Sequence, residues 1–176
     1  MTPSRPLPIA TAAELADADL EARAASRRAA REAPLMQAIL RLFADSGGPV
    51  DVRAVAAVRP EMPAEEVRRG LRNLDDDDLL VLRGDLVTLA YPFSAAPTGF
   101  VARRAGGSER FICCAIDALG LAPMLGEPVE VAATCHRSRA PLRFAVAPDG
   151  PAPEAEAIMV WVTRSGPDEA RACTGL

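Results

Sequence analysis

The sequence is organised around one ten-residue stretch, Phe111-Ile112-Cys113-Cys114-Ala115-Ile116-Asp117-Ala118-Leu119-Gly120. It follows a glycine-serine turn at residues 106–108, and its apolar residues Ile112, Ile116 and Leu119 recur at three- and four-residue steps. This spacing predicts a short helix that buries one apolar stripe. Gly120 and the following segment at residues 123–126 are expected to break the helix.

A thiol and a carboxylate occupy neighbouring positions on this predicted helix. Cys114 and Asp117 are three residues apart, which places them on the same face. A carboxylate at that spacing can accept or return the proton of the thiol. Because unpaired backbone N–H groups at a helix start favour a thiolate, we expect Cys114 to be alkylated faster than Cys135 near neutral pH. The alternative interpretation is two buried cysteines followed by an aspartate that caps the helix.

Length and composition limit the classes of protein that fit. The 176 residues suit one ordinary domain or two small ones, and 49% of them are hydrophobic, which can fill a core. The net charge of −4 gives no general attraction to nucleic acid or to anionic membranes. No apolar run could span a bilayer, and the N-terminus lacks an apolar signal core. We therefore expect a cytoplasmic protein with no nucleic-acid partner and no membrane partner.

The four cysteines are Cys113, Cys114, Cys135 and Cys173. In a cytoplasmic protein they should be reduced thiols rather than a disulfide framework. The absence of a C-x-x-C pair gives little support to a structural zinc site. His136 follows Cys135 directly and is expected to be a loop residue rather than a ligand.

The first half of the chain predicts a helical region with a small hairpin. Residues 1–33 are expected to form a loose tail and an alanine-rich helix from about residue 9 to residue 32. The elements expected next are a helix from Pro34 that stops at Ser46-Gly47-Gly48, a short helix carrying Val52, Val55 and Val58, a third helix from Ala64 to about Leu74, and strands Leu79–Leu82 and Leu86–Leu89 joined by Arg83-Gly84-Asp85. Together these elements predict a winged helix-turn-helix-like domain at residues 34–93.

Winged helix-turn-helix domains can read DNA with their third helix, which here carries Arg68, Arg69 and Arg72. The same helix, however, runs directly into the acidic run at residues 75–78, which would face the phosphates. A structural or partner-docking role is therefore expected for this region rather than DNA binding.

The second half of the chain, residues 94–176, predicts strands. Phe100-Val101 is expected to be a short strand, and the period changes to two in the segments that lead to Cys135 and away from Pro141. Residues 148–153 are expected to form a loop, and the apolar run at residues 158–162 is expected to be a central strand. A last helix should begin near Gly166 and reach Cys173.

Taken together, these features resemble the organomercurial lyase (alkylmercury lyase) family over roughly residues 34–173. The resemblance rests on the winged-helix-like start, the motif Cys114-Ala115-Ile116-Asp117 with Cys135 placed 21 positions after its cysteine, and the segments Pro123–Gly126, Ala140–Pro148 and Ile158–Val162. It implies an α+β fold, with an N-terminal winged-helix-like helical part at residues 34–93 and a mixed β-sheet domain with flanking helices at residues 94–176.

The resemblance also implies an enzyme, a carbon–mercury lyase that protonates a carbon–mercury bond and releases a hydrocarbon and Hg(II). Cys114 would capture the mercury, since thiolate is the soft ligand that a soft metal prefers. Asp117 would shuttle the proton, Cys173 would be the second catalytic thiol, and these three residues would form the metal-ligand set. Cys135 would support structure. No resident cofactor is implied, but small thiols are needed for turnover.

The implied partners are an organomercurial small molecule and, as acceptor of Hg(II), cellular thiols or a mercuric reductase. The sequence departs from the family pattern in two places. Cys113 stands where the family usually carries a large aromatic residue, which makes Cys113 an alternative second thiol. The family also continues beyond the position of Cys173, so we expect that residue to be held less firmly here.

Two other classes of protein remain open at this point. One is a protein of the same fold that binds a soft metal or a thiol without breaking a bond. The other is a winged-helix regulator whose cysteines sense metal or redox state. Activity towards an alkyl- or arylmercury compound separates the lyase from the binder, and retention on DNA would identify the regulator.

Overall fold

The computed structural model describes residues 9–15, 22, 26 and 32–161. Internal contacts divide the chain into two units, residues 1–33 and residues 34–176. In the first unit, helix α1 (Ala12–Leu15) begins after Thr11, whose backbone N–H donates to the Glu14 carboxylate at 2.7 Å. Most of the helix expected over residues 9–32 lies outside the described residues. Among the described residues, no helix has the length and apolar character that a membrane span requires.

Three helices open the second unit, close to the predicted positions. They are α3 (Ala33–Ser46), α4 (Val52–Val58) and α5 (Ala64–Asp76). The side chains buried at helical spacing are Leu35, Ile39 and Phe43 in α3, Val52 and Val55 in α4, and Val67, Leu71 and Leu74 in α5. Because these apolar stripes recur every three or four residues, the sequence alone identified the helices and their inward faces. Val58, at the end of α4, is 48% exposed.

Local chemistry explains where these helices begin and end. The Asp51 carboxylate caps the start of α4 by accepting the backbone N–H of Arg53 at 2.7 Å. After α3 the chain turns through Gly47 and Gly48, both with positive φ. A Cβ atom at Gly48 would lie 2.3 Å from the ring of Phe43, so only glycine fits this turn.

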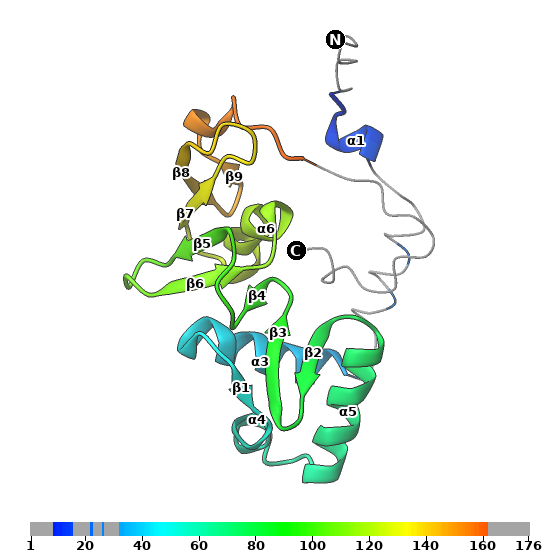
Figure 1. The fold of residues 1–176 in the computed structure, drawn as a ribbon. Coiled ribbons are helices and arrows are strands. Elements are labelled where there is room, and N and C mark those ends of the chain that lie inside the picture. The colour runs from blue at the N-terminus through cyan, green and yellow to red at the C-terminus, as the bar shows by residue number, and fades with distance from the viewer. Residues whose placement is uncertain (1–8, 16–21, 23–25, 27–31, 162–176) are drawn as a thin grey trace. The chain divides into compact units, whose positions relative to one another are not determined.

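The strands of the second unit form one sheet (Figure 1). They are β1 (Val50–Asp51), β2 (Leu80–Arg83), β3 (Leu86–Ala90), β4 (Phe93–Ser94), β5 (Phe100–Arg103), β6 (Glu109–Ile112), β7 (Val129–Thr134), β8 (Pro141–Ala147) and β9 (Gly150–Pro151). Their order is β1-β3-β4-β6-β5-β7-β8-β9, with β2 paired to β3. Apart from the two-residue β1, these strands follow helices α3 to α5 in the chain, so the fold class is α+β.

All pairs among the described strands are antiparallel, so the expectation of a mixed sheet is wrong for this part of the chain. A parallel pair needs a crossover of a dozen or more residues, whereas short turns join β2 to β3, β5 to β6 and β7 to β8. The sheet also runs without interruption past residue 93, because β4 pairs with β3 on one side and with β6 on the other. The domain boundary after residue 93 stays a prediction.

The central strand expected at residues 158–162 is absent from the part of that segment that the structure describes, residues 158–161. This segment follows a 3-10 turn at Pro153–Ala155, and its side chains Met159 and Trp161 are 63% and 67% exposed. The segment expected to be a loop contains β9, which pairs with Val146 and Ala147 at the end of β8. An apolar run alone does not make a buried strand, because a strand also needs a partner with which to pair.

The organising stretch also differs from its prediction. Residues up to Ile112 belong to strand β6, and the helix α6 runs from Ala115 to Leu125, past Gly120 and Pro123. Its buried residues are Ala118, Leu121 and Ala122, whereas Ile116 is 60% exposed. The predicted apolar stripe combined Ile112 of β6 with Ile116 and Leu119 of α6. The four-residue spacing between Ile112 and Ile116 does not reveal that a strand ends between them. Helix α6 stops at Gly126, which has the positive φ of 70° that favours glycine there.

Two arginines attach the end of α3 to the sheet. Arg110 donates to the carbonyl oxygens of Ala44 at 2.8 Å and of Asp45 at 2.6 Å. Arg104 donates to the same Ala44 carbonyl at 2.9 Å and to the Glu127 carboxylate at 2.6 Å. These bonds satisfy carbonyl groups that the last turn of a helix leaves without intrahelical partners. They therefore fix α3 against β5, β6 and the segment that follows α6.

Candidate functional site

The site is built where strand β6 gives way to helix α6. Cys114 is the N-cap of α6 and has an extended backbone, with φ −150° and ψ 179°. Its thiol donates to the Asp117 carboxylate with an Sγ–Oδ2 distance of 3.0 Å. In return, the backbone N–H of Asp117 donates to Cys114 Sγ at 3.4 Å. Cys114 and Asp117 are therefore neighbours, as predicted. Cys114, however, caps the helix instead of belonging to it.

Partial burial governs the protonation of this pair. Burial, followed by the hydrogen bond to Asp117, raises the pKa of the Cys114 thiol to about 11. Burial also raises the pKa of the Asp117 carboxyl above its usual range, although the bond from Cys114 opposes the shift. At neutral pH the pair therefore holds a proton on Cys114. The sequence-based expectation that the helix start would make Cys114 a thiolate is wrong, because desolvation outweighs the N-terminal backbone groups.

Cys135 has the opposite environment. It lies at the start of the turn between β7 and β8, where its Sγ accepts the backbone N–H of Ser138 at 3.5 Å. The hydrogen bonding from Ser138 lowers the pKa of the Cys135 thiol. His136, which follows it, is an exposed residue of the same turn, as predicted.

These opposite pKa shifts reverse the expected order of alkylation. At pH 7.5 a short pulse of limiting iodoacetamide should label Cys135 well before Cys114, because only the thiolate reacts and Cys114 is further from its pKa. Peptide mass mapping of the labelled protein measures the order. Raising the pH towards 11 should increase labelling of Cys114 steeply. Preferential labelling of Cys114 at pH 7.5 would contradict the burial argument.

The adjacent Cys113 has different surroundings from Cys114. It is 2% exposed, and its backbone N–H donates to the carbonyl of Pro92 at 2.9 Å. Cys113 lines a hollow of about 340 Å³ together with residues of β3, β4, β5 and the connection between β4 and β5, whereas Cys114 is not part of that lining. An extended backbone such as that of Cys114 directs consecutive side chains to opposite sides. This geometry does not favour Cys113 and Cys114 as a pair that shares one ligand.

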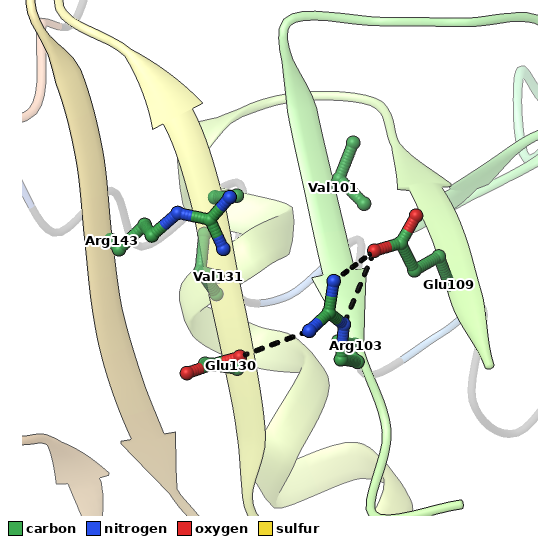
Figure 2. A pocket seen from close by; sticks show the side chains of 7 residues that line it. Val101, Arg103, Glu109, Glu130, Val131 and Arg143 are labelled. Carbon is green, nitrogen blue, oxygen red and sulfur yellow. Dashed lines mark hydrogen bonds and ion pairs between the residues drawn. The ribbon is translucent and has the colours of Figure 1, made fainter. Parts of the chain in front are cut away.

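A second hollow, of about 230 Å³, lies on strands β5 to β8 (Figure 2). Figure 2 shows Arg103 between the carboxylates of Glu109 and Glu130, with contacts of 2.6 Å and 3.9 Å. Arg143 of β8 contributes another guanidinium to the lining. Neither Cys114 nor Asp117 lines this hollow. The charged groups of β5, β6 and β7 therefore satisfy one another at a place separate from the thiol–carboxylate pair.

The third predicted site residue, Cys173, lies outside the described residues. Within residues 9–15, 22, 26 and 32–161, no group of three or more histidine, cysteine, aspartate or glutamate side chains is placed to hold a metal ion. The described cysteines form no disulfide. The structure thus brings together two of the three predicted site residues, Cys114 and Asp117.

The fold and the site define an α+β protein with a thiol–carboxylate pair at the junction between a strand and a helix. Residues 93–175 match the family described as alkylmercury lyase. Alkylmercury lyases of Staphylococcus epidermidis and Streptomyces lividans are each 30% identical to this chain over 115 residues, which is 65% of this chain. Through this region the chain is similar to the alkylmercury lyase family.

The extent of the similarity is limited. The matched region is 50% of the Staphylococcus epidermidis relative and 51% of the Streptomyces lividans relative, so the chain spans about half the length of these relatives. The crystal structure of the mercury-bound form of MerB2 superimposes with a TM-score of 0.59 and 21% identity, covering 69% of this chain and 58% of that chain. At this level of identity, the superposition is evidence for the fold alone.

Proposed function

We propose that the protein is an organomercurial lyase, in which Cys114 captures the mercury of an organomercurial and Asp117 transfers a proton to its carbon. Similarity to the alkylmercury lyase family supports the class of reaction. The 3.0 Å contact between Cys114 Sγ and Asp117 Oδ2 is the observation that carries the assignment of roles. A proton shared between these two atoms is available for transfer without diffusion of an external acid.

The proposed reaction begins with a substrate in which mercury is bound to an organic group and to a small thiolate. Cys114 sulfur forms a bond to mercury, the small thiolate leaves, and the thiol proton moves to Asp117. A pKa of about 11 does not prevent this step, because a bound metal cation deprotonates a coordinating thiol. The raised pKa of the Asp117 carboxyl helps it to hold the proton after the transfer.

In the second step the carbon–mercury bond breaks. Its electron pair accepts the proton from Asp117, so the organic group leaves as a hydrocarbon and Asp117 returns to the carboxylate. Mercury remains as Hg(II) on sulfur and is removed by external thiols, which return a proton to Cys114. Mercury is the cargo of this reaction, and the proposal includes no resident cofactor.

A second thiolate on mercury would make the carbon more basic and ease its protonation. We assign this role to Cys173, in keeping with the family resemblance, and retain Cys113 as the alternative. Cellular thiols or a mercuric reductase are the proposed acceptors of Hg(II). For residues 34–93, the proposed role of the winged-helix-like part is structural: Arg68 is already bonded to Asp85 at 2.5 Å, and Arg69 lies 3.9 Å from Glu66.

The test is turnover of phenylmercury with an excess of a small thiol, with benzene release followed by gas chromatography. The wild type should release benzene over many cycles. Cys173→Ser should lower the rate by orders of magnitude, since one protein thiolate alone forms a stable mercury adduct. Equal rates for wild type and Cys173→Ser would transfer the second role to Cys113, to be checked with Cys113→Ser. If the wild type binds phenylmercury without releasing benzene, the protein is a mercury binder and the lyase proposal fails.

A further inference from the structure

The connection between β4 and β5 crosses the end of the strand that leads to Cys114. Strands β4 and β5 flank β6 on its two sides, and Ile112, the last residue of β6, is the Cα partner of both Phe93 and Phe100. Residues 95–99 therefore carry the chain from one side of β6 to the other. Thr98 therefore lies next to Ile112 at the end of β6. Ile112 precedes the proposed mercury ligand, Cys114, by two residues.

Thr98 bonds directly to that strand end. Its hydroxyl donates to the carbonyl oxygen of Ile112 at 2.6 Å, and it also lies 2.9 Å from the carbonyl oxygen of Phe100. A hydroxyl has one hydrogen, and the shorter distance indicates that Ile112 receives it. The Thr98 oxygen in turn accepts the backbone N–H of Phe100 at 3.2 Å. The side chain thus ties the start of β5 to the end of β6.

The next residue is held from the other side of β6. The backbone N–H of Cys113 donates to the carbonyl of Pro92 at 2.9 Å, and Ile112 itself is fully buried. Both polar groups of the single peptide unit between Ile112 and Cys113 are therefore held, the carbonyl by Thr98 of the crossing connection and the N–H by Pro92, the residue before β4. Cys114 then begins α6 as its N-cap, where its thiol meets Asp117. Removing one of the two attachments leaves a buried carbonyl without its partner and the strand end less constrained.

We propose that Thr98 is a positioning residue for Cys114, whose hydroxyl fixes the end of β6 and so sets the contact between the Cys114 thiol and the Asp117 carboxylate. The inference rests on the proposed function of this pair. Thr98 touches neither reacting group, and its effect is transmitted through Ile112 and Cys113. Proton transfer depends steeply on such placement, since a displacement of about 1 Å can lower a rate by about 100-fold.

The test compares Thr98→Val, which removes the hydroxyl and keeps the shape, with Thr98→Ser, which keeps the hydroxyl. Thr88→Val is the matched control, because the half-buried Thr88 also donates to a strand carbonyl, that of Val81 at 3.3 Å, in another part of the sheet. The first readout is kcat for benzene release from phenylmercury. The second is the pH dependence of Cys114 alkylation, followed by mass mapping.

Thr98→Val should lower kcat about tenfold or more while phenylmercury capture stays stoichiometric. It should also move the alkylation midpoint of Cys114 to lower pH, because a looser strand end weakens both the burial and the Asp117 bond that raise this pKa. Thr98→Ser and Thr88→Val should stay within about twofold of the wild-type rate, with an unchanged midpoint. If Thr98→Val does not fold, Thr98→Ala takes its place in both measurements.

An unchanged midpoint in Thr98→Val overturns the proposal, even if kcat falls, since a purely structural role would lower activity without changing the environment of the thiol. Equal losses in Thr98→Val and Thr98→Ser overturn it as well. If the wild type releases no benzene, the proposed lyase function fails, and the alkylation midpoint alone decides the role of Thr98. The two failures are therefore distinguishable.

Discussion

Cys114→Ser is expected to abolish release of hydrocarbon from an organomercurial, with a loss of activity on the order of 1,000-fold or more. The hydroxyl of serine is a hard and poor ligand for mercury, so the substrate would not be held beside Asp117. The substitution removes the sulfur and keeps the short side chain that caps α6, so the fold should persist. Benzene release from phenylmercury in excess thiol is the measurement, and circular dichroism checks folding.

Cys135→Ser is the matched control for this substitution. Cys135 is also a thiol whose sulfur accepts a backbone N–H three residues later, in this case that of Ser138. It lies in the turn between β7 and β8 and does not contact Asp117, which bonds to Cys114. Cys135→Ser should therefore keep the wild-type rate. Substantial cleavage by Cys114→Ser, or equal losses in the two variants, would contradict the assignment of Cys114.

Asp117→Asn is expected to separate mercury capture from bond cleavage. Asparagine keeps the size of the side chain and cannot take the thiol proton, so Cys114 should still bind one phenylmercury while benzene release falls by about 100- to 10,000-fold. Capture is measured as protein-bound mercury by mass spectrometry after removal of free reagent, and cleavage by gas chromatography. Benzene release at the wild-type rate by Asp117→Asn would exclude Asp117 as the proton donor.

The stability of Asp117→Asn provides an independent check on the same residue. Burial raises the pKa of the Asp117 carboxyl in the folded protein, so the folded state binds its proton more tightly than the unfolded state. The stability associated with this group is therefore present below the unfolded pKa and is lost as pH rises through the folded pKa. Asparagine resembles the protonated acid at every pH. Asp117→Asn should thus match the wild type in urea denaturation at low pH and become the more stable protein at neutral pH.

The helices of the first half were predictable because each carries its own apolar period. Val67, Leu71 and Leu74 recur at helical steps, and the structure buries all three in α5. The hairpin of β2 and β3 followed from two apolar runs that flank Gly84. Such patterns are local, since neighbouring residues are enough to specify them. The contact between Cys114 and Asp117 is local in the same sense, because residues three apart come together at the start of a helix.

Where the local sequence pattern was ambiguous, tertiary structure determined which residues form strands and which are buried. Ile112 and Ile116 have a helical spacing, yet one is the last buried residue of β6 and the other is exposed on α6, because pairing with β4 and β5 extends the strand as far as Ile112. The apolar run at residues 158–162 has the pattern of a buried strand, but its described part forms none, since a strand also needs a pairing partner, which a sequence pattern does not reveal. Such pairing partners come from distant parts of the sequence.

The chemistry of the site divides in the same way. The sequence alone determined that a thiol and a carboxylate would be neighbours and that they resemble an alkylmercury lyase motif. It did not determine their protonation, because the pKa of Cys114 depends on desolvation by residues packed around it, and that effect exceeds the influence of the helix start. Thr98 gave no signal in the sequence, since its bond to Ile112 spans 14 residues and exists only because residues 95–99 cross β6. Residues close in sequence specify the capping position of Cys114. Its burial, and the hydrogen bond from Thr98 that fixes the end of β6, depend on the assembled sheet.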